Sequence, residues 1–297
     1  IQNKCCRHGA SLRRRRRRRR KILRSIIFSC SIIAVAVFVA VGSSMIRSGD
    51  GRTNRYDVEA GNNTYDNAVI ENSKISEKNK IQNNQSMLDD IMNSTQYPKQ
   101  LKDLALKNEE ALEFVYDYPA EHVKEHTIDL TEEASMDSVP LFVQWDKRWG
   151  YEKYSGNFFA ASGCGPTTLS MVVVYLTHDR EASPIAVAKY SKEAGYSVDG
   201  SGSSWTLISE GCRHYGVKAK AVALDESRMK AELDEGHPIV VNVGPGDFTD
   251  TGHFMVITGY DDEGFSINDP NSIEKSGKRW LFKNISSQIR AVWSMYV

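Results

Sequence analysis

The chain has 297 residues, with 38 basic and 38 acidic side chains and 40% hydrophobic residues. This length and composition suit one or two folded domains and exclude a fibrous, disulfide-stapled or wholly disordered protein. The charges are unevenly distributed, because residues 1–42 carry 12 basic and no acidic side chains, which leaves a net charge of −12 on the rest of the chain. Such an acidic body argues against nucleic acid as a partner.

An apolar segment without charges lies at residues 25–46, after a basic stub at residues 1–24. At a rise of about 1.5 Å per residue, a helix of this length crosses roughly 30 Å of hydrocarbon, so the sequence predicts one transmembrane helix. The eight-arginine run at 13–20 places the N-terminus in the cytoplasm and the later residues outside the cell by the positive-inside rule. A signal peptide cleaved near Ala40 is the alternative, but the apolar run exceeds the usual length of about 7–15 residues. The sequence therefore favours an uncleaved signal anchor of a single-pass cell-membrane protein.

A polar stretch at residues 47–97 follows the anchor and is rich in Asn, Ser, Asp, Glu and Lys. A segment of this composition does not bury enough apolar surface to fold alone. The sequence therefore predicts a disordered linker between the membrane and the folded domain.

The folded domain is expected at residues 98–297, where the pattern changes. Its first apolar residues recur at helical spacing, namely Leu101, Leu104, Leu112 and Val115. This spacing predicts a docking helix within an extension at residues 98–137, and Pro119 is expected to end that helix.

Short strands and helices alternate in the rest of the domain. The pattern predicts a strand at 217–224, a helix that starts at Asp225 and a buried strand at 238–243. The sequence HFMVITGYDDEGFSIND then predicts two strands joined at Asp261–Gly264. A clear apolar helix follows Pro166, and the total predicts an α+β domain with an antiparallel sheet.

Cys164 has the setting of a nucleophile. Gly163 and Gly165 flank it, Pro166 suits the first helical turn, and the apolar helix follows at once. The thiol is therefore expected at a helix N-terminus, where unpaired N–H groups carry roughly half a positive charge and favour the thiolate. The flanking glycines would let a substrate backbone approach, which makes them candidate substrate-binding residues. The alternative is a small buried hydrophobic residue in a tight turn.

A nucleophilic thiol needs a base, and His253 is the best-placed histidine. It follows a loop that ends at Gly252, a further candidate substrate contact, and Asp269 closes the next strand of the same hairpin. The carboxylate is then able to hold the imidazole. Without a bulge the two side chains lie on opposite faces, so a one-residue bulge is required, expected at Gly264. Taken singly, these residues also suit a satisfied strand-end histidine and an Asp-Pro turn.

Acyl transfer also needs hydrogen-bond donors for an oxyanion. The backbone N–H of Cys164 is one candidate, and a side-chain amide from Gln144 or Asn157 is another, although each amide also suits a turn. Trp205, in a loop rich in Gly and Ser, is either a substrate contact or a core residue. Cys212 is expected to be buried, but a Cys164–Cys212 disulfide would disable the nucleophile. No metal ligands stand at metal spacing, and no cofactor is expected.

The ordered set of Gln144, Cys164-Gly165-Pro166-Thr167, Gly252-His253-Phe254 and Asn268-Asp269-Pro270 resembles the bacteriocin-processing peptidases that cleave double-glycine leaders, and their stand-alone relatives in the papain-like superfamily. The likeness covers about residues 138–297. It implies a papain-like cysteine peptidase fold in which Cys164 is the nucleophile, His253 the base, Asp269 the orienting residue and Gln144 the oxyanion-hole amide. Papain-like enzymes usually place that glutamine only a few residues before the cysteine, whereas 20 residues separate the two here.

Leader peptidases of this kind are often fused to an exporting ATPase on the cytoplasmic side, but this sequence contains no Walker A motif. The sequence predicts instead a membrane-anchored cysteine peptidase or amide hydrolase at a bacterial cell surface. Its expected substrate is a peptide, a surface protein or a cell-wall peptide. The alternative is a catalytically inactive module that keeps the peptidase-like fold to bind surface ligands. Transpeptidation by the same three residues stays open.

Overall fold

The computed structural model describes the backbone from Asn62 to Val297 and the side chains from Ser76 onward. The predicted cytoplasmic stub and transmembrane helix, residues 1–24 and 25–46, lie outside the described residues. Between Asn62 and Val297, no helix combines the length and the apolar character needed to cross a membrane. The compact unit that holds the candidate site comprises Glu71–Val297.

Helix α2 (Asn62–Asn93) occupies much of the stretch that the composition predicts to be a disordered linker. The structure differs from the expectation here for two reasons. The helix contains neither Gly nor Pro, and its last turns are anchored by Ile91, which is fully buried with Leu101. Composition reflects what a segment buries alone, whereas this helix packs its end against the domain. The boundaries of the linker and the domain stay predictions.

Short helices replace the single docking helix that the spacing predicts. They are α3 (Lys99–Lys107), η1 (Glu109–Ala111), α4 (Leu112–Tyr116), α5 (Tyr118–Glu121) and α6 (Thr131–Ser135). The four apolar residues expected to pack are buried. The break lies at Asn108, whose extended backbone and side-chain bond to the Glu110 N–H interrupt the helix. Pro119 does not end the helix but lies in the first turn of α5, where its missing N–H costs little.

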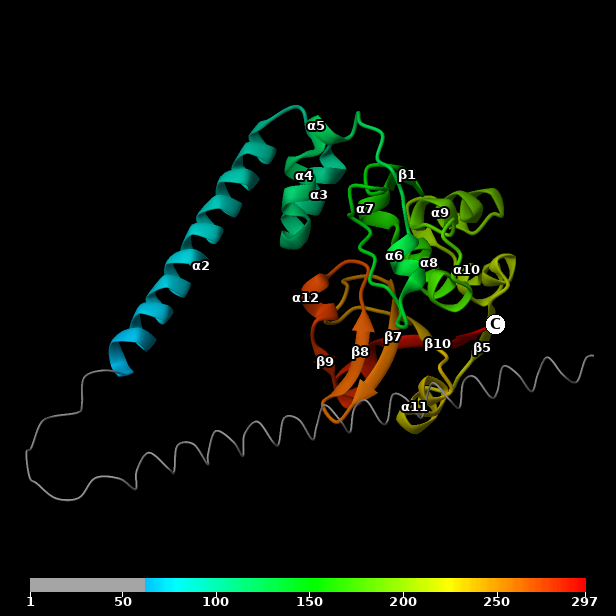
Figure 1. The fold of residues 1–297 in the computed structure, drawn as a ribbon. Coiled ribbons are helices and arrows are strands. Elements are labelled where there is room, and N and C mark those ends of the chain that lie inside the picture. The colour runs from blue at the N-terminus through cyan, green and yellow to red at the C-terminus, as the bar shows by residue number, and fades with distance from the viewer. Residues whose placement is uncertain (1–61) are drawn as a thin grey trace, which may run out of the picture. The chain divides into compact units, whose positions relative to one another are not determined.

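A six-stranded antiparallel sheet forms the centre of the domain, in the order β5-β10-β6-β7-β8-β9 (Figure 1). Its strands are β5 (Lys218–Ala221), β6 (Ile239–Val243), β7 (His253–Asp261), β8 (Gly264–Asn268), β9 (Arg279–Trp280) and β10 (Ile289–Tyr296). Helix α8 (Cys164–Thr177) packs on one face, and α11 (Glu226–Asp234) packs on the other. The predicted α+β class with an antiparallel sheet is confirmed.

Smaller elements complete the domain. They are β1 (Lys153–Tyr154), β2 (Asn157–Phe158), α7 (Phe159–Ser162), α9 (Pro184–Glu193), β3 (Ser197–Val198), β4 (Gly202–Ser203), α10 (Thr206–Ser209), η2 (Gly211–Tyr215), α12 (Ile273–Ser276), α13 (Phe282–Ile285) and η3 (Ser286–Gln288). The pairs β1-β2 and β3-β4 form two separate two-stranded ribbons.

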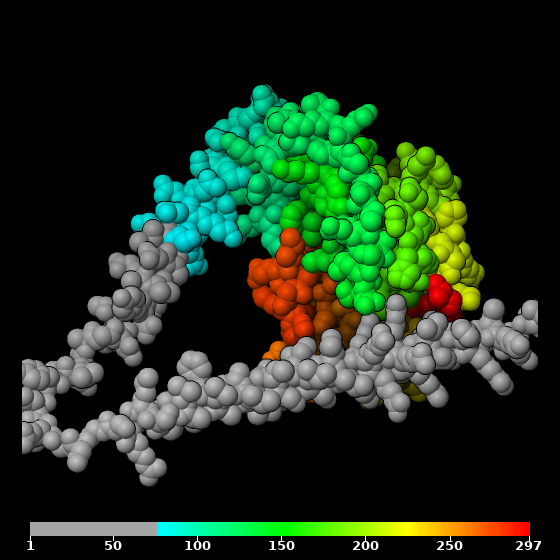
Figure 2. Space-filling model, viewed as in Figure 1, coloured from blue at the N-terminus to red at the C-terminus, as the bar shows by residue number. Residues whose placement is uncertain are grey.

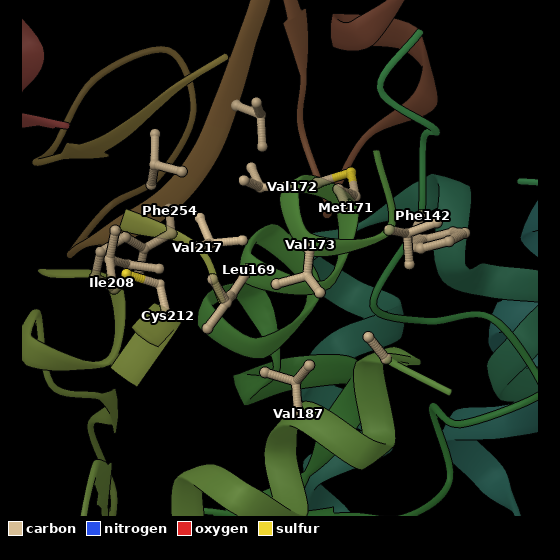
Figure 3. Close-up of a cluster of buried hydrophobic side chains, with 14 of the residues drawn as sticks. Phe142, Leu169, Met171, Val172, Val173, Val187, Ile208, Cys212, Val217 and Phe254 are labelled. Carbon is tan, nitrogen blue, oxygen red and sulfur yellow. The ribbon is translucent and has the colours of Figure 1, made fainter. Parts of the chain in front are cut away.

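Helix α8 is the element that positions Cys164. It is apolar on all sides, and residues 165–174 are buried, as expected for a helix enclosed by its neighbours. Figure 3 shows its side chains between strand β7 and helix α9, with Leu169 and Val173 between Phe254 and Val187. Because such a close-packed core permits little movement, the start of α8 is held in a fixed position against β7.

The hairpin of β7 and β8 contains a one-residue bulge, as the sequence requires. The pairing register shifts between Ile257 and Gly259, so the extra residue lies between them. This shift brings His253 and Asp269 to the same face of the hairpin. The bulge is confirmed, but its expected position at Gly264 is wrong. Gly264 instead begins β8 with a φ of +134°, a conformation that strains any residue with a side chain.

Candidate active site

The site is built around Cys164, the first residue of α8. Gly163 precedes the helix with no side-chain cap, and Pro166 follows in the first turn. The first backbone N–H groups of a helix have no partner within it and attract negative charge. Cys164 is half-buried, and as the first residue of α8 it lies at this positive end.

His253 begins β7 and is only 6% exposed. Its Nε2 lies 2.7 Å from Oδ1 of Asp269, and its ring interacts electrostatically with the thiol of Cys164. Because Nε2 is occupied by the carboxylate, Nδ1 is the ring nitrogen left for the sulfur. The structure therefore brings together the three residues that the sequence singles out as nucleophile, base and orienting residue.

The electrostatics of the three side chains favour a thiolate–imidazolium pair. Burial raises the pKa of Cys164, but the hydrogen bond and charge of His253, with backbone N–H groups of Phe254 and Gly165, outweigh it and lower the pKa below its ordinary value. Burial lowers the pKa of His253, but the charge and hydrogen bond of Asp269 outweigh it and raise the pKa above its ordinary value. Each shift stabilises the charged form of its group.

Asp269 is fully buried in the turn after β8. Besides the His253 ring, its Oδ1 accepts a hydrogen bond from the Asn271 N–H at 2.8 Å. Its Oδ2 has no hydrogen-bond partner among the described residues. The orientation of the carboxylate thus depends on Oδ1 and on the backbone turn that carries it.

Gln144 forms hydrogen bonds both to the turn that carries Asp269 and to the helix before Cys164. Its backbone N–H donates to the Pro270 carbonyl at 2.7 Å, and its Nε2 donates to the Ala160 carbonyl at 2.7 Å. Pro270 follows Asp269, and Ala160 lies in α7, shortly before Cys164. The interval of 20 residues between Gln144 and Cys164 contains the β1-β2 ribbon and α7. One of the two Nε2 hydrogens is used by Ala160, and Oε1 has no hydrogen-bond partner among the described residues, so the oxyanion role of this amide stays a prediction.

Asn157, the other amide considered for the oxyanion, has a local role in the structure. Its Oδ1 accepts a hydrogen bond from the N–H of Phe158 at 2.7 Å. This is the behaviour of a residue that shapes a turn.

Gly163 and Gly165 are both needed for close packing. A Cβ at Gly163 would lie 2.6 Å from the Phe159 ring, and one at Gly165 would lie 2.5 Å from Oγ of Ser203. A Cβ at Gly252 would meet nothing within 4 Å. The expected contacts of the three glycines with a substrate stay predictions. Close packing is a separate reason why positions 163 and 165 are occupied by glycine.

The Gly165→Ala variant is expected to be destabilised by about 1–3 kcal/mol, because the added methyl group overpacks the contact between α8 and β4. Gly252→Ala is the matched control, with an expected change within about 0.5 kcal/mol because its surroundings are open. Urea unfolding of the two variants measures both values. Equal stability of the two variants would contradict this account of the packing.

Trp205 precedes α10 and is 47% exposed. Its ring packs edge-on against Trp293, with ring centroids 6.0 Å apart. It follows Ser203, whose side chain lies next to Gly165, by two positions. It is partly packed and partly open, and its expected contact with a substrate stays a prediction.

The two described cysteines differ sharply. Both are free thiols, so the structure does not contain the alternative disulfide between Cys164 and Cys212. Cys212 is fully buried, and burial raises its pKa to about 11. Cys212 is therefore an inert core thiol, as its sequence setting predicts.

Tyr154 is a neighbour of Cys164 that the sequence did not indicate. Its hydroxyl is hydrogen-bonded to Oγ of Ser191 at 2.8 Å and Oγ of Ser203 at 2.7 Å. Burial raises the pKa of Tyr154, and the negative charge of Cys164 adds to this rise. The only local signal is the Ser155-Gly156 turn beside it, in which both residues have positive φ, and this signal predicts a turn but no site.

Metal ligands were not expected from the sequence. Within the described part of the chain, no group of three or more His, Cys, Asp or Glu side chains is arranged to hold a metal ion.

The solved structures that are similar to the chain include two of low identity. The peptidase domain of Streptococcus ComA, a bifunctional ABC transporter involved in quorum sensing, is 20% identical, with a TM-score of 0.36 over 46% of this chain and 90% of that domain. A Bacillus anthracis protein described as a C39-like peptidase is 16% identical, with a TM-score of 0.34 over 54% of this chain and 95% of that one. No curated protein sequence matches the chain.

The family is identified by a sequence match and not by these structures. The profile of the Peptidase_C39 like family matches residues 136–297, which is more than half of the chain. The match begins within two residues of the region in which Gln144, Cys164, His253 and Asp269 suggest the resemblance. The chain therefore belongs to the Peptidase_C39 like family.

Proposed function

We propose that the protein is a membrane-anchored extracellular cysteine peptidase or amide hydrolase that acts on peptide or cell-wall substrates. Membership of a C39-like peptidase family suggests cysteine peptidase activity. The observation that carries the proposal is the 2.7 Å contact between Nε2 of His253 and Oδ1 of Asp269, on the strand that packs against the buried helix beginning with Cys164. A nucleophile, a base and an orienting carboxylate in this order are what acyl transfer requires.

The proposed reaction begins with the thiolate of Cys164 and the imidazolium of His253. The thiolate attacks the substrate carbonyl, and the resulting oxyanion accepts hydrogen bonds from the Cys164 N–H and from Nε2 of Gln144. His253 gives its proton to the leaving amine as the C–N bond breaks, which leaves a thioester on Cys164. Water then loses a proton to His253 and attacks the thioester, and the released acid restores the free enzyme.

The same ion pair sets the expected pH window. The thiolate forms as the pH rises through the lowered pKa of Cys164, and the imidazolium is lost as the pH rises through the raised pKa of His253. The reactive pair is therefore populated between these two values, and the rate is expected to be bell-shaped in pH.

The function is tested by incubating the full-length protein, in mild detergent, with a peptide library and with cell-wall muropeptides, and reading new ends by mass spectrometry. New amine and carboxylate ends that depend on Cys164 support hydrolysis, whereas a product joined to an added amine indicates transpeptidation. Binding without any cleavage would favour the inactive binding module.

The membrane anchor and the extracellular location rest on the sequence of residues 13–46. They are tested by adding protease to intact cells that express the full chain. Loss of the domain at residues 98–297 supports the proposed orientation, and protection until the cells are lysed contradicts it.

A further inference from the structure

The turn that carries Asp269 is fixed by few contacts of its own. The Asn271 N–H donates to the Asp269 carboxylate, and the Ser272 N–H donates to the Asp269 carbonyl at 3.2 Å. The Asp269 N–H donates to Oγ of Ser276 at 2.9 Å. Because Oδ2 of Asp269 has no partner among the described residues, any shift of this turn changes how the carboxylate meets His253.

Glu110, from the N-terminal extension, holds the far side of that turn. Its Oε1 accepts a hydrogen bond from the hydroxyl of Ser272. Its Oε2 accepts hydrogen bonds from the N–H groups of Ile273 at 2.7 Å and Glu274 at 3.1 Å. One carboxylate thus binds three consecutive residues directly after the turn, and hydrogen bonds to a charged group are the stronger kind.

Asn108 holds the middle of the same turn. Its Nδ2 donates to the Asn271 carbonyl at 2.9 Å and to the Asn271 Oδ1 at 3.1 Å. The indole N–H of Trp145 donates to the same carbonyl at 3.2 Å. The Oδ1 of Asn108 meanwhile accepts from the Glu110 N–H, so the two extension residues support each other.

Figure 1 shows α12 next to one end of α3, and in Figure 2 the orange surface of this part of the chain adjoins the green surface, although more than 160 residues separate α12 from α3 in sequence. Asn108 and Glu110 lie before residue 136, where the family match begins. Both line a surface cavity of about 930 Å³ with Ser272, so replacing their polar groups leaves no enclosed void. The two side chains therefore come from outside the matched region, and they bind residues 271–274 inside it.

We propose that Asn108 and Glu110 are positioning residues that hold the Asp269 turn, so that the extension is part of the working peptidase site. This inference rests on the proposed function, because its effect passes through Asp269 to His253 and Cys164. Neither residue contacts the reacting atoms. Their role is to keep the carboxylate aimed at the imidazole, as outer partners do for other reactive histidines.

Alkylation of Cys164 by iodoacetamide at pH 6, in the full-length protein, measures the effect. Asn108→Asp keeps the acceptor for the Glu110 N–H but loses the N–H donors to Asn271. Glu110→Gln loses one of the two oxygens that accept hydrogen bonds from residues 272–274. Each variant is expected to slow the reaction roughly tenfold, which is within the range of one lost hydrogen bond. On an Asp269→Asn background the effect of Glu110→Gln is expected to fall below about twofold, because the two act in series.

The matched control is Glu109→Gln, whose carboxylate binds only Asn84 in the hydrogen bonds of the described chain, at 2.8 Å. It is expected to react like the unmodified protein. A charge effect alone would change the alkylation rate of Cys164 in opposite directions in Asn108→Asp and Glu110→Gln, because one adds a negative charge and the other removes one. Loss of positioning slows the alkylation in both variants. Opposite directions, or a lowered unfolding temperature with an unchanged pH profile, would overturn the proposal. If the unmodified protein lacks low-pH reactivity, the proposed function fails as well, and with it this role.

Discussion

Replacing Cys164 with Ala is expected to abolish hydrolysis, with a fall of at least about 10⁴-fold in kcat/KM. The thiolate supplies the bond to the substrate carbonyl, and it stands at the start of α8 beside His253. Loss of a nucleophile that acts with its base as one unit removes most of the rate that the unit provides. The initial rate of cleavage on the substrate found in the library screen measures this effect.

Cys212→Ala is the matched control for this substitution. Its thiol is also free, but it is fully buried and has a pKa raised to about 11. We expect full activity and a loss of stability of about 1–2 kcal/mol from the small cavity. If Cys164→Ala retained activity, or lost only stability as Cys212→Ala does, Cys164 would be a core residue and the binding-module hypothesis would lead.

The His253→Ala variant is expected to lose about 10³–10⁴-fold in kcat/KM. The imidazole lowers the pKa of Cys164 and also carries the proton to the leaving amine, so one substitution removes both contributions. Steady-state rates from pH 5 to pH 10 measure the loss. Some activity is expected to return at high pH, where the thiol of the variant ionises without help.

His237→Ala serves as the control for this variant. His237 lies at the far end of β6, where its Nδ1 is 3.1 Å from Glu232. We expect unchanged kcat/KM, because no contact of His237 reaches the candidate site. Equal losses in both histidine variants would show that the effect comes from a general loss of folding and not from the base.

The hairpin that carries His253 and Asp269 is an example of what the sequence alone predicts and what it does not. Alternation of apolar residues predicts both strands, and the parity of the two positions reveals that a bulge is required. Its position is not predictable from that parity, because a bulge anywhere in the hairpin restores the same face. The structure places it between Ile257 and Gly259, inside β7 and away from the turn.

Contacts between distant segments are the part that the sequence does not predict. Gln144 binds Ala160 and Pro270, which lie 16 and 126 residues away in sequence, so both contacts depend on the tertiary fold. Glu110 reaches the Asp269 turn across more than 160 residues, and nothing near it in sequence indicates this partner. Helix α2 is not predicted for a related reason, because its polar composition does not indicate that Ile91 is buried against the domain. Local patterns predict the elements, whereas tertiary packing decides these contacts.

The most direct test of the proposed ion pair is the rate of iodoacetamide alkylation at each cysteine of the full-length protein as a function of pH, read by peptide mass spectrometry. Because the pKa of Cys164 is lowered and that of Cys212 is raised to about 11, the two thiols of one sample serve as probe and reference. We expect Cys164 to react rapidly well below the ordinary thiol pKa of about 8.5 and to lose this reactivity in His253→Ala, and we expect no reaction of Cys212 in the folded protein. Reaction of Cys164 that sets in only near pH 8.5, or no reaction at all, would contradict the proposed ion pair.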